Sequence, residues 1–102
     1  MTPRPVGGLS ELEIGSVRRI EVDGVAVCLV RTADGVHAVS DVCSHADVSL
    51  AEGELDGSTI ECWLHGSRFD LATGSPSGLP ATRPVPVYPV TVDGDTVFVD
   101  VP

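Results

Sequence analysis

The chain consists largely of short apolar runs rich in valine, isoleucine and threonine, and helix signals are almost absent. Such runs are typical of β-strands. The expected strands are 16–22, 25–32, 36–40, 59–61, 68–71, 85–92 and 96–101. Asp-Gly pairs separate several runs, at 23–24, 34–35 and 93–94. Both residue types tolerate the positive φ of a type I′ turn. The pattern predicts an all-β fold, a small antiparallel barrel or sandwich.

The composition of two expected strands predicts where they lie in the sheet, and two other segments are expected to lack regular structure. The run 25–32 is nearly all apolar, so we expect it to be buried on both faces. The run 85–92 contains prolines, which lack the N–H of a strand ladder, so we expect its start to be irregular or at a sheet edge. Residues 1–8 are expected to form a loose arm and residues 72–82 a loop, because both are rich in proline and glycine.

Length and charge narrow the class of protein. The 102 residues are expected to form one domain, 1–102, with a modest core. A net charge of −9 argues against nucleic acid and against anionic membrane surfaces, and favours a partner with a basic face. No N-terminal signal or long apolar run is visible, so we expect a cytoplasmic protein.

All the cysteine and histidine residues that are expected to bind metal lie between Asp41 and Asp70. Cys43 and His45 form a Cys-x-His pair, and Cys62 and His65 form a Cys-x-x-His pair. Two thiolates and two imidazoles on two loops make a candidate four-ligand metal site, suited to zinc or to an iron–sulfur centre. Zinc sites usually pair like with like in sequence, as in C-x-x-C, whereas this chain twice pairs a cysteine with a histidine.

The remaining cysteine and histidine are interpreted as structural. Cys28 lies in the apolar run V-A-V-C-L-V, where it is expected to act as a small buried hydrophobe. If Cys43 and Cys62 are ligands, no disulfide within the chain can form without destroying the site, which fits a reducing compartment. His37 is interpreted as a strand residue unrelated to the metal.

With its two mixed pairs, the sequence resembles the Rieske [2Fe–2S] family, in particular the small bacterial Rieske ferredoxins. The resemblance extends to H-G-S-R-F-D at 65–70, G-L-P at 78–80 and the C-terminal hairpin. It implies a Rieske fold with a cluster-binding subdomain at about 41–82. It also implies one [2Fe–2S] cluster, held by two cysteines on one iron and two histidines on the other. The metal ligands would be Cys43, His45, Cys62 and His65.

The resemblance also implies a set of residues around the cluster. Gly66 would let the loop approach the cluster closely, and Ser67 would donate a hydrogen bond to a bridging sulfide. Phe69 stands where high-potential relatives carry a tyrosine, which points to a low potential. Pro80 belongs to a loop that covers the cluster in the family. Trp63 could shield the cluster, form part of the docking face, or simply pack.

The function implied by the resemblance is that of a one-electron carrier, not an enzyme. Such a ferredoxin takes electrons from a flavin-dependent ferredoxin reductase and passes them to a (di)oxygenase-type acceptor, or another redox acceptor with a basic docking face. It is expected to be a monomer. Two alternatives stay open: an accessory ferredoxin in iron–sulfur cluster assembly, because C-W-L-H-G-S resembles that subgroup, and a zinc-stabilised interaction domain.

Overall fold

The computed structural model describes residues 3–42, 48–63, 66–76 and 83–101. Within these ranges the chain forms β-strands and two short 3₁₀ helices, η1 and η2. In chain order they are β1 (Arg4–Gly8), η1 (Leu9–Glu11), β2 (Val17–Val22), β3 (Val25–Thr32), β4 (Gly35–Ser40), η2 (Leu50–Glu52), β5 (Leu55–Asp56), β6 (Thr59–Glu61), β7 (Arg68–Asp70), β8 (Val87–Tyr88), β9 (Val90–Asp93) and β10 (Thr96–Val99).

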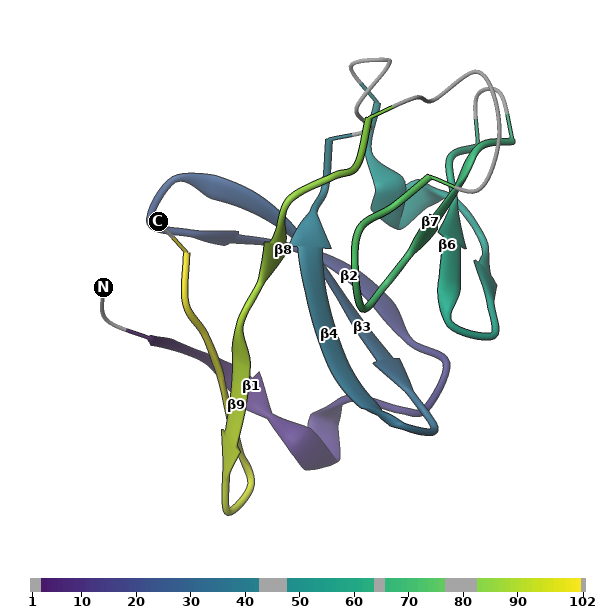
Figure 1. The fold of residues 1–102 in the computed structure, drawn as a ribbon. Coiled ribbons are helices and arrows are strands. Elements are labelled where there is room, and N and C mark those ends of the chain that lie inside the picture. The colour runs from purple at the N-terminus through teal and green to yellow at the C-terminus, as the bar shows by residue number, and fades with distance from the viewer. Residues whose placement is uncertain (1–2, 43–47, 64–65, 77–82, 102) are drawn as a thin grey trace.

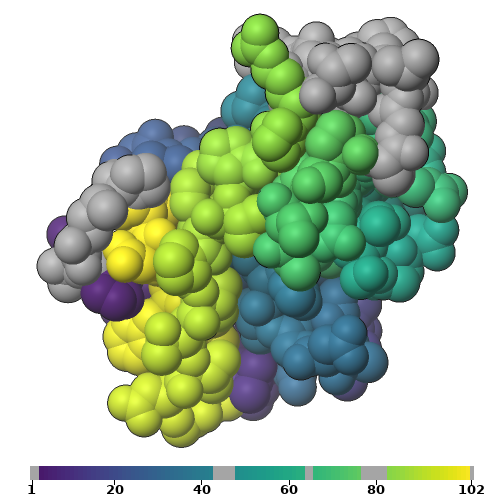
Figure 2. All heavy atoms as spheres, viewed as in Figure 1, coloured from purple at the N-terminus to yellow at the C-terminus, as the bar shows by residue number. Residues whose placement is uncertain are grey.

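The strands form three antiparallel sheets, which confirms the all-β prediction. The central sheet has the order β2-β3-β4-β8, the second β1-β10-β9 and the third β5-β6-β7. Figure 1 shows the second and third sheets on opposite sides of the central one. In the space-filling view the teal and green surface of the third sheet forms a distinct lobe (Figure 2).

The core lies on both faces of the central sheet. Successive side chains of a strand point to opposite faces, and β3 follows this rule: Cys28 and Val30 pack with the third sheet, while Val27 and Leu29 pack with the second. All four are at most 2% exposed. The interior of β3 is therefore buried on both faces, as its apolar composition predicts.

The turns follow the Asp-Gly signals. Asp23 and Gly24 have φ values of 49° and 82°, the left-handed conformation that a type I′ turn requires at both central positions. Their turn joins β2 to β3, which pair in register from Val17 opposite Val30 to Val22 opposite Val25.

Proline divides the expected strand 85–92, and its predicted irregular start is confirmed. β8 and β9 are separated by Pro89 and belong to different sheets: β8 pairs with β4, whereas β9 pairs with β10. The chain thus leaves the central sheet and enters the second sheet at this proline.

The loose arm expected at residues 1–8 is wrong for the described part. Residues Arg4–Gly8 form β1, which pairs with β10. Pro5 is tolerated because β1 is an edge strand with one neighbour, and a register shift between Pro5 and Gly7 marks a bulge. The segment that connects the two ligand pairs contains η2 and β5.

Candidate functional site

Three segments contain the predicted cluster loops, and described residues fix the base of each. The first loop follows β4. The backbone N–H of Leu50 donates to the carbonyl of Asp41 at 2.6 Å, and Val42 forms an isolated β-bridge with Ser49. These contacts bring together the two ends of the segment that contains Cys43 and His45.

The second loop joins β6 to β7. The Cys62 N–H donates to the Ser67 carbonyl at 2.6 Å, and the Gly66 N–H donates to the Cys62 carbonyl at 2.9 Å. Gly66 has a φ of +77°, a left-handed conformation that favours glycine. A Cβ there would meet Glu61 Oε1 at 3.7 Å, an ordinary contact, so among the described atoms the backbone conformation is what favours glycine.

The third loop begins after β7 and returns before β8. The Val85 N–H donates to the Gly74 carbonyl at 2.9 Å. The two backbones approach so closely that a Cβ on Gly74 would lie 2.0 Å from the Val85 carbonyl oxygen. This contact fixes the two sides of the segment that contains Pro80.

The three loop bases are also joined to one another. The Glu61 N–H donates to the Glu54 carbonyl at 2.8 Å, which ties the chain after the first loop to the strand before the second. Phe69 bridges to Pro76 at the start of the third loop. The Ser40 N–H donates to the Pro86 carbonyl at 2.9 Å, which joins the first and third bases. All three segments therefore start from one end of the molecule.

The described site residues are mostly buried around this junction. Cys62 and Phe69 are fully buried and belong to the same core cluster, and Ser67 is 1% exposed. Trp63 and Gly66 are the exceptions: half of the Trp63 surface is exposed, and Gly66 is exposed in the turn. The predicted residues Cys43, His45, His65 and Pro80 lie outside the described residues.

Cys28 and His37 occupy the positions expected of structural residues. His37 lies in β4 opposite Val30. Cys28 is fully buried in β3. Burial, and to a lesser extent the charge of Asp41, raises the pKa of the Cys28 thiol from 9.0 to about 12. Because the thiolate is the form that binds metal, this cysteine is poorly suited to be a ligand.

One of the four predicted ligands, Cys62, lies in the described part of the chain, and its surroundings suit a cluster site. Within the described ranges no group of three or more His, Cys, Asp or Glu side chains could hold a metal ion, and three of the four predicted ligands lie outside those ranges. Cys62 is a free, buried cysteine at the junction of the three loop bases. A soft sulfur donor at that place suits an iron–sulfur centre.

Sequence reasoning missed residues that hold the loop bases, among them Asp41 and Gly53. Asp41 is 1% exposed and accepts hydrogen bonds from the far end of the first loop. Gly53 packs so tightly on β6 that a Cβ would lie 1.6 Å from the Glu61 carbonyl oxygen. The signal for Asp41 was its position between an apolar strand and Cys43, whereas a tertiary contact such as that of Gly53 leaves no signal in one sequence.

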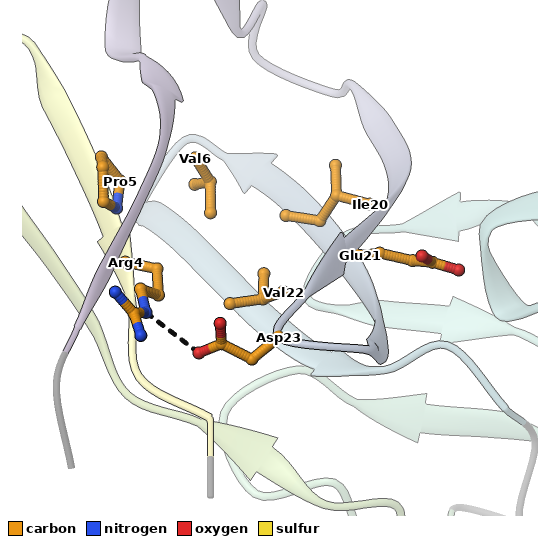
Figure 3. A pocket seen from close by; sticks show the side chains of 7 residues that line it. All are labelled: Arg4, Pro5, Val6, Ile20, Glu21, Val22 and Asp23. Carbon is orange, nitrogen blue, oxygen red and sulfur yellow. Dashed lines mark hydrogen bonds and ion pairs between the residues drawn. The ribbon is translucent and has the colours of Figure 1, made fainter.

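A surface recess lies apart from these loop bases. It has a volume of about 550 Å³ and lies between β1 and β2. Figure 3 shows Arg4 reaching across it to Asp23, an exposed ion pair of 3.0 Å. Its lining is Arg4, Pro5, Val6, Ile20, Glu21, Val22 and Asp23, none of which is a predicted site residue.

Among the residues that the structure describes, no helix is long and apolar enough to cross a membrane.

Comparisons with known proteins agree with this geometry. The family model of the Rieske [2Fe-2S] domain matches residues 2–89. The 3-phenylpropionate/cinnamic acid dioxygenase ferredoxin subunit of Escherichia coli is 40% identical over 96% of this chain and 90% of its own. The ferredoxin of carbazole 1,9a-dioxygenase from Nocardioides aromaticivorans is 44% identical, with a TM-score of 0.92 over 97% of both chains.

A further solved structure is a complex of reduced oxygenase and oxidised ferredoxin in carbazole 1,9a-dioxygenase. It matches with a TM-score of 0.90 and 37% identity over 95% of this chain and 91% of that chain. The family match covers most of the chain and agrees with the all-β fold and with the paired Cys–His motif. The chain therefore belongs to the Rieske [2Fe–2S] family and is a Rieske-type ferredoxin, an electron-transfer protein that carries a [2Fe–2S] cluster.

Proposed function

We propose that this ferredoxin passes single electrons from a flavin-dependent ferredoxin reductase to the oxygenase component of a Rieske non-haem iron oxygenase system. The observation that carries the proposal is the full-length similarity to ferredoxins of such systems, with 97% of both chains covered in one case. The family match also favours an iron–sulfur cluster over the zinc alternative. As a small module with one core on each face of its central sheet, residues 1–102 are proposed to form one domain and to act as a monomer.

The cluster would be held by Cys43, His45, Cys62 and His65, and would supply reversible one-electron transfer. The chain contributes a dry surrounding on the side of β6 and β7. There Cys62, Ser67 and Phe69 are at most 1% exposed. Ser67 is proposed to donate a hydrogen bond toward the cluster, Gly66 to shape the turn between Cys62 and Ser67, and Pro80 to cover the third side.

The docking face is proposed to lie around the two ligand loops. Trp63 and Val42, each adjacent in sequence to a predicted ligand cysteine, are 50% and 44% exposed. Apolar side chains at the centre of a patch with a polar rim are typical of protein interfaces. Glu52, Glu54 and Asp56 are exposed on the neighbouring η2–β5 segment, where they would attract a basic partner.

A single-turnover experiment tests the proposed acceptor. The reduced ferredoxin is mixed anaerobically with the oxygenase component of a carbazole 1,9a-dioxygenase, and its reoxidation is followed by absorbance. We expect reoxidation at a rate that saturates with oxygenase concentration. Reoxidation no faster than with an unrelated acceptor of equal potential would count against an oxygenase partner of this kind.

Trp63→Ala tests the docking face in the same assay. We expect the apparent Kd for the oxygenase to rise about tenfold or more, as for an aromatic interface residue worth over about 1.4 kcal/mol, while the visible spectrum is unchanged. Val92→Ala is the matched control, because Val92 is 43% exposed and lies on β9 in the second sheet. Equal effects of the two variants would remove Trp63 from the interface.

The cell compartment that we propose rests on the predicted cluster ligands. The predicted ligands Cys43 and Cys62 must stay reduced to bind a cluster, and a reducing compartment keeps thiols in that state. We therefore place the protein in the cytoplasm, where a flavin-dependent reductase can supply its electrons.

A further inference from the structure

We propose that Asp41 is a positioning residue for the cluster. Its buried carboxylate holds together the two ends of the loop that carries Cys43 and His45, and its negative charge lowers the reduction potential of the cluster. The inference rests on the family assignment and adds a residue that the predicted ligand set and its expected neighbours do not include. Asp41 lies immediately after β4 and two positions before Cys43.

The Asp41 side chain is only 2% exposed, which is unusual for a carboxylate. Oδ1 accepts a hydrogen bond from the Ala51 N–H at 2.9 Å, and Oδ2 accepts one from the Ser49 hydroxyl at 2.5 Å. Oδ2 also lies 3.2 Å from Arg19 Nε. A buried carboxylate is tolerated only when it is paired and hydrogen-bonded, and here both oxygens are used.

These partners define a clamp. Ser49 and Ala51 lie where the chain returns from the first loop, and Asp41 lies where the chain enters it. The backbone of Asp41 adds two contacts: its N–H donates to the Ala26 carbonyl at 3.1 Å, and its carbonyl accepts from Leu50. The loop ends are therefore attached to each other, to β3 through Ala26, and to β2 through Arg19.

The charge of Asp41 also reaches the core beneath the site. Asp41 contributes, after burial, to the raised pKa of the Cys28 thiol. Cys28 and the predicted ligand Cys62 belong to the same buried cluster. A negative charge in such a low-dielectric region disfavours the addition of an electron nearby. The carboxylate therefore positions the loop and lowers the reduction potential.

Charge-changing variants of the holoprotein test both parts. Asp41→Asn keeps the side-chain shape and removes the negative charge, so we expect a higher midpoint potential. Arg19→Gln removes the positive partner, so we expect a lower one. Asp23→Asn is the control, because Asp23 is also paired with an arginine but is half exposed at the β2–β3 turn; we expect no shift. Unchanged potentials, or shifts of the same sign in Asp41→Asn and Arg19→Gln, would overturn the electrostatic role.

Cluster loss tests the clamp separately. For Asp41→Ala and for the milder Ser49→Ala, we expect the cluster to be lost to a chelator at least fivefold faster than in Val97→Ala. Val97 is fully buried in the core on the other face of the central sheet, so Val97→Ala lowers global stability without touching the loop. We also expect altered EPR g-values in the two loop variants only. Rates that merely follow thermal stability, with unchanged g-values, would overturn the clamp.

Should Asp41→Ala fail to fold, Ser49→Ala and Asp41→Asn still decide the matter. An unreactive acceptor in the single-turnover assay would leave these spectroscopic results unaffected, so failure of the proposed acceptor and failure of the clamp are distinguishable.

Discussion

At the scale of single residues, Ser67 and Phe69 are buried side chains close to the predicted ligand Cys62. Both follow the ligand loop on or beside β7 and are at most 1% exposed. Phe69 pairs with Ile60 across β6 and β7 and bridges to Pro76. Their burial next to Cys62 in space means that a hydrogen bond added or removed here acts in a low dielectric, where it is stronger than in water.

Removing the Ser67 hydroxyl and adding a hydroxyl at Phe69 are expected to move the midpoint potential in opposite directions. A difference of about 1 kcal/mol between redox states corresponds to about 40 mV for one electron, since ~1.4 kcal/mol corresponds to ~59 mV. Ser67→Ala should lower the potential by some tens of millivolts, and Phe69→Tyr should raise it by a similar amount. The two shifts should nearly add if the donors reach different sulfurs. Protein-film voltammetry on both single variants and the double variant measures this.

The burial of Phe69 defines the result that would contradict the prediction for Phe69→Tyr. A tyrosine hydroxyl that finds no acceptor in this core would cost about 1–3 kcal/mol in stability. Lower thermal stability with an unchanged potential would show that position 69 does not face a cluster sulfur. An unchanged potential in Ser67→Ala would likewise contradict the role that the family resemblance gives to this serine.

Cys28 is expected to make folding stability depend on pH in alkali. Its pKa is raised from 9.0 to about 12 in the folded protein. The folded state therefore holds the thiol proton more tightly than the unfolded state. The resulting stabilisation is fully present below pH 9 and is lost as pH rises toward 12, with a slope of at most about 1.4 kcal/mol per pH unit. The difference in unfolding free energy between wild type and Cys28→Ala should shrink over this interval, whereas a constant difference would contradict the shift.

At the scale of elements, the sequence predicted most strands because their apolar runs and Asp-Gly turns are local signals. It did not predict β1, because the prolines and glycines of residues 3–8 suggest a coil, and only pairing with β10, far along the chain, makes them a strand. Likewise, β5 depends on pairing with β6, and η2 on packing against β2 and β3, rather than on composition. The close approaches at Gly53 and Gly74 were missed for the same reason: they are contacts between segments.

Gly53 is expected to be intolerant of any side chain. Its φ of −86° is open to all residues, but a Cβ would lie 1.6 Å from the Glu61 carbonyl oxygen. Backbone cannot yield as a flexible side chain can, so Gly53→Ala should cost about 3 kcal/mol or more. For a domain of this size the melting temperature should fall by more than about 10 °C. Thermal unfolding followed by circular dichroism measures the effect.

Gly57→Ala is the control for this prediction. Gly57 has a φ of +59° and open space around its Cβ position. Only backbone strain should oppose the substitution, at about 1–2 kcal/mol. If Gly53→Ala proved no more destabilising than Gly57→Ala, the close contact between the first loop base and β6 would be wrong, and with it the way the two ligand loops are joined.

At the scale of the molecule, the sequence predicted a metal centre from two mixed Cys–His pairs, and the fold explains how residues far apart in sequence come together there. The three loop bases meet at one end, while the recess between β1 and β2 is lined only by residues of the N-terminal strands and the β2–β3 turn. What the sequence could not predict is this hydrogen-bonded junction, because its contacts join either the two ends of one loop or residues of different loops, and one sequence gives no signal for such tertiary contacts.

The net charge of −9 gives the last prediction. The exposed residues Glu52 and Glu54 lie on the chain between the two ligand pairs, so they are placed to guide a basic partner toward the ligand loops. Salt screens such attraction, since the Debye length falls from about 30 Å at 0.01 M to about 8 Å at 0.15 M. We expect the second-order rate constant for reduction by the cognate reductase, measured by stopped flow, to fall about tenfold over this range.

Replacing both glutamates by glutamine should weaken the salt dependence. The pair Asp34→Asn and Asp93→Asn removes the same charge from the β3–β4 turn and from the end of β9, outside the loop bases, and should change the salt dependence less. A rate constant that stayed flat or rose with salt, or equal effects of the two double variants, would contradict electrostatic guidance to this face.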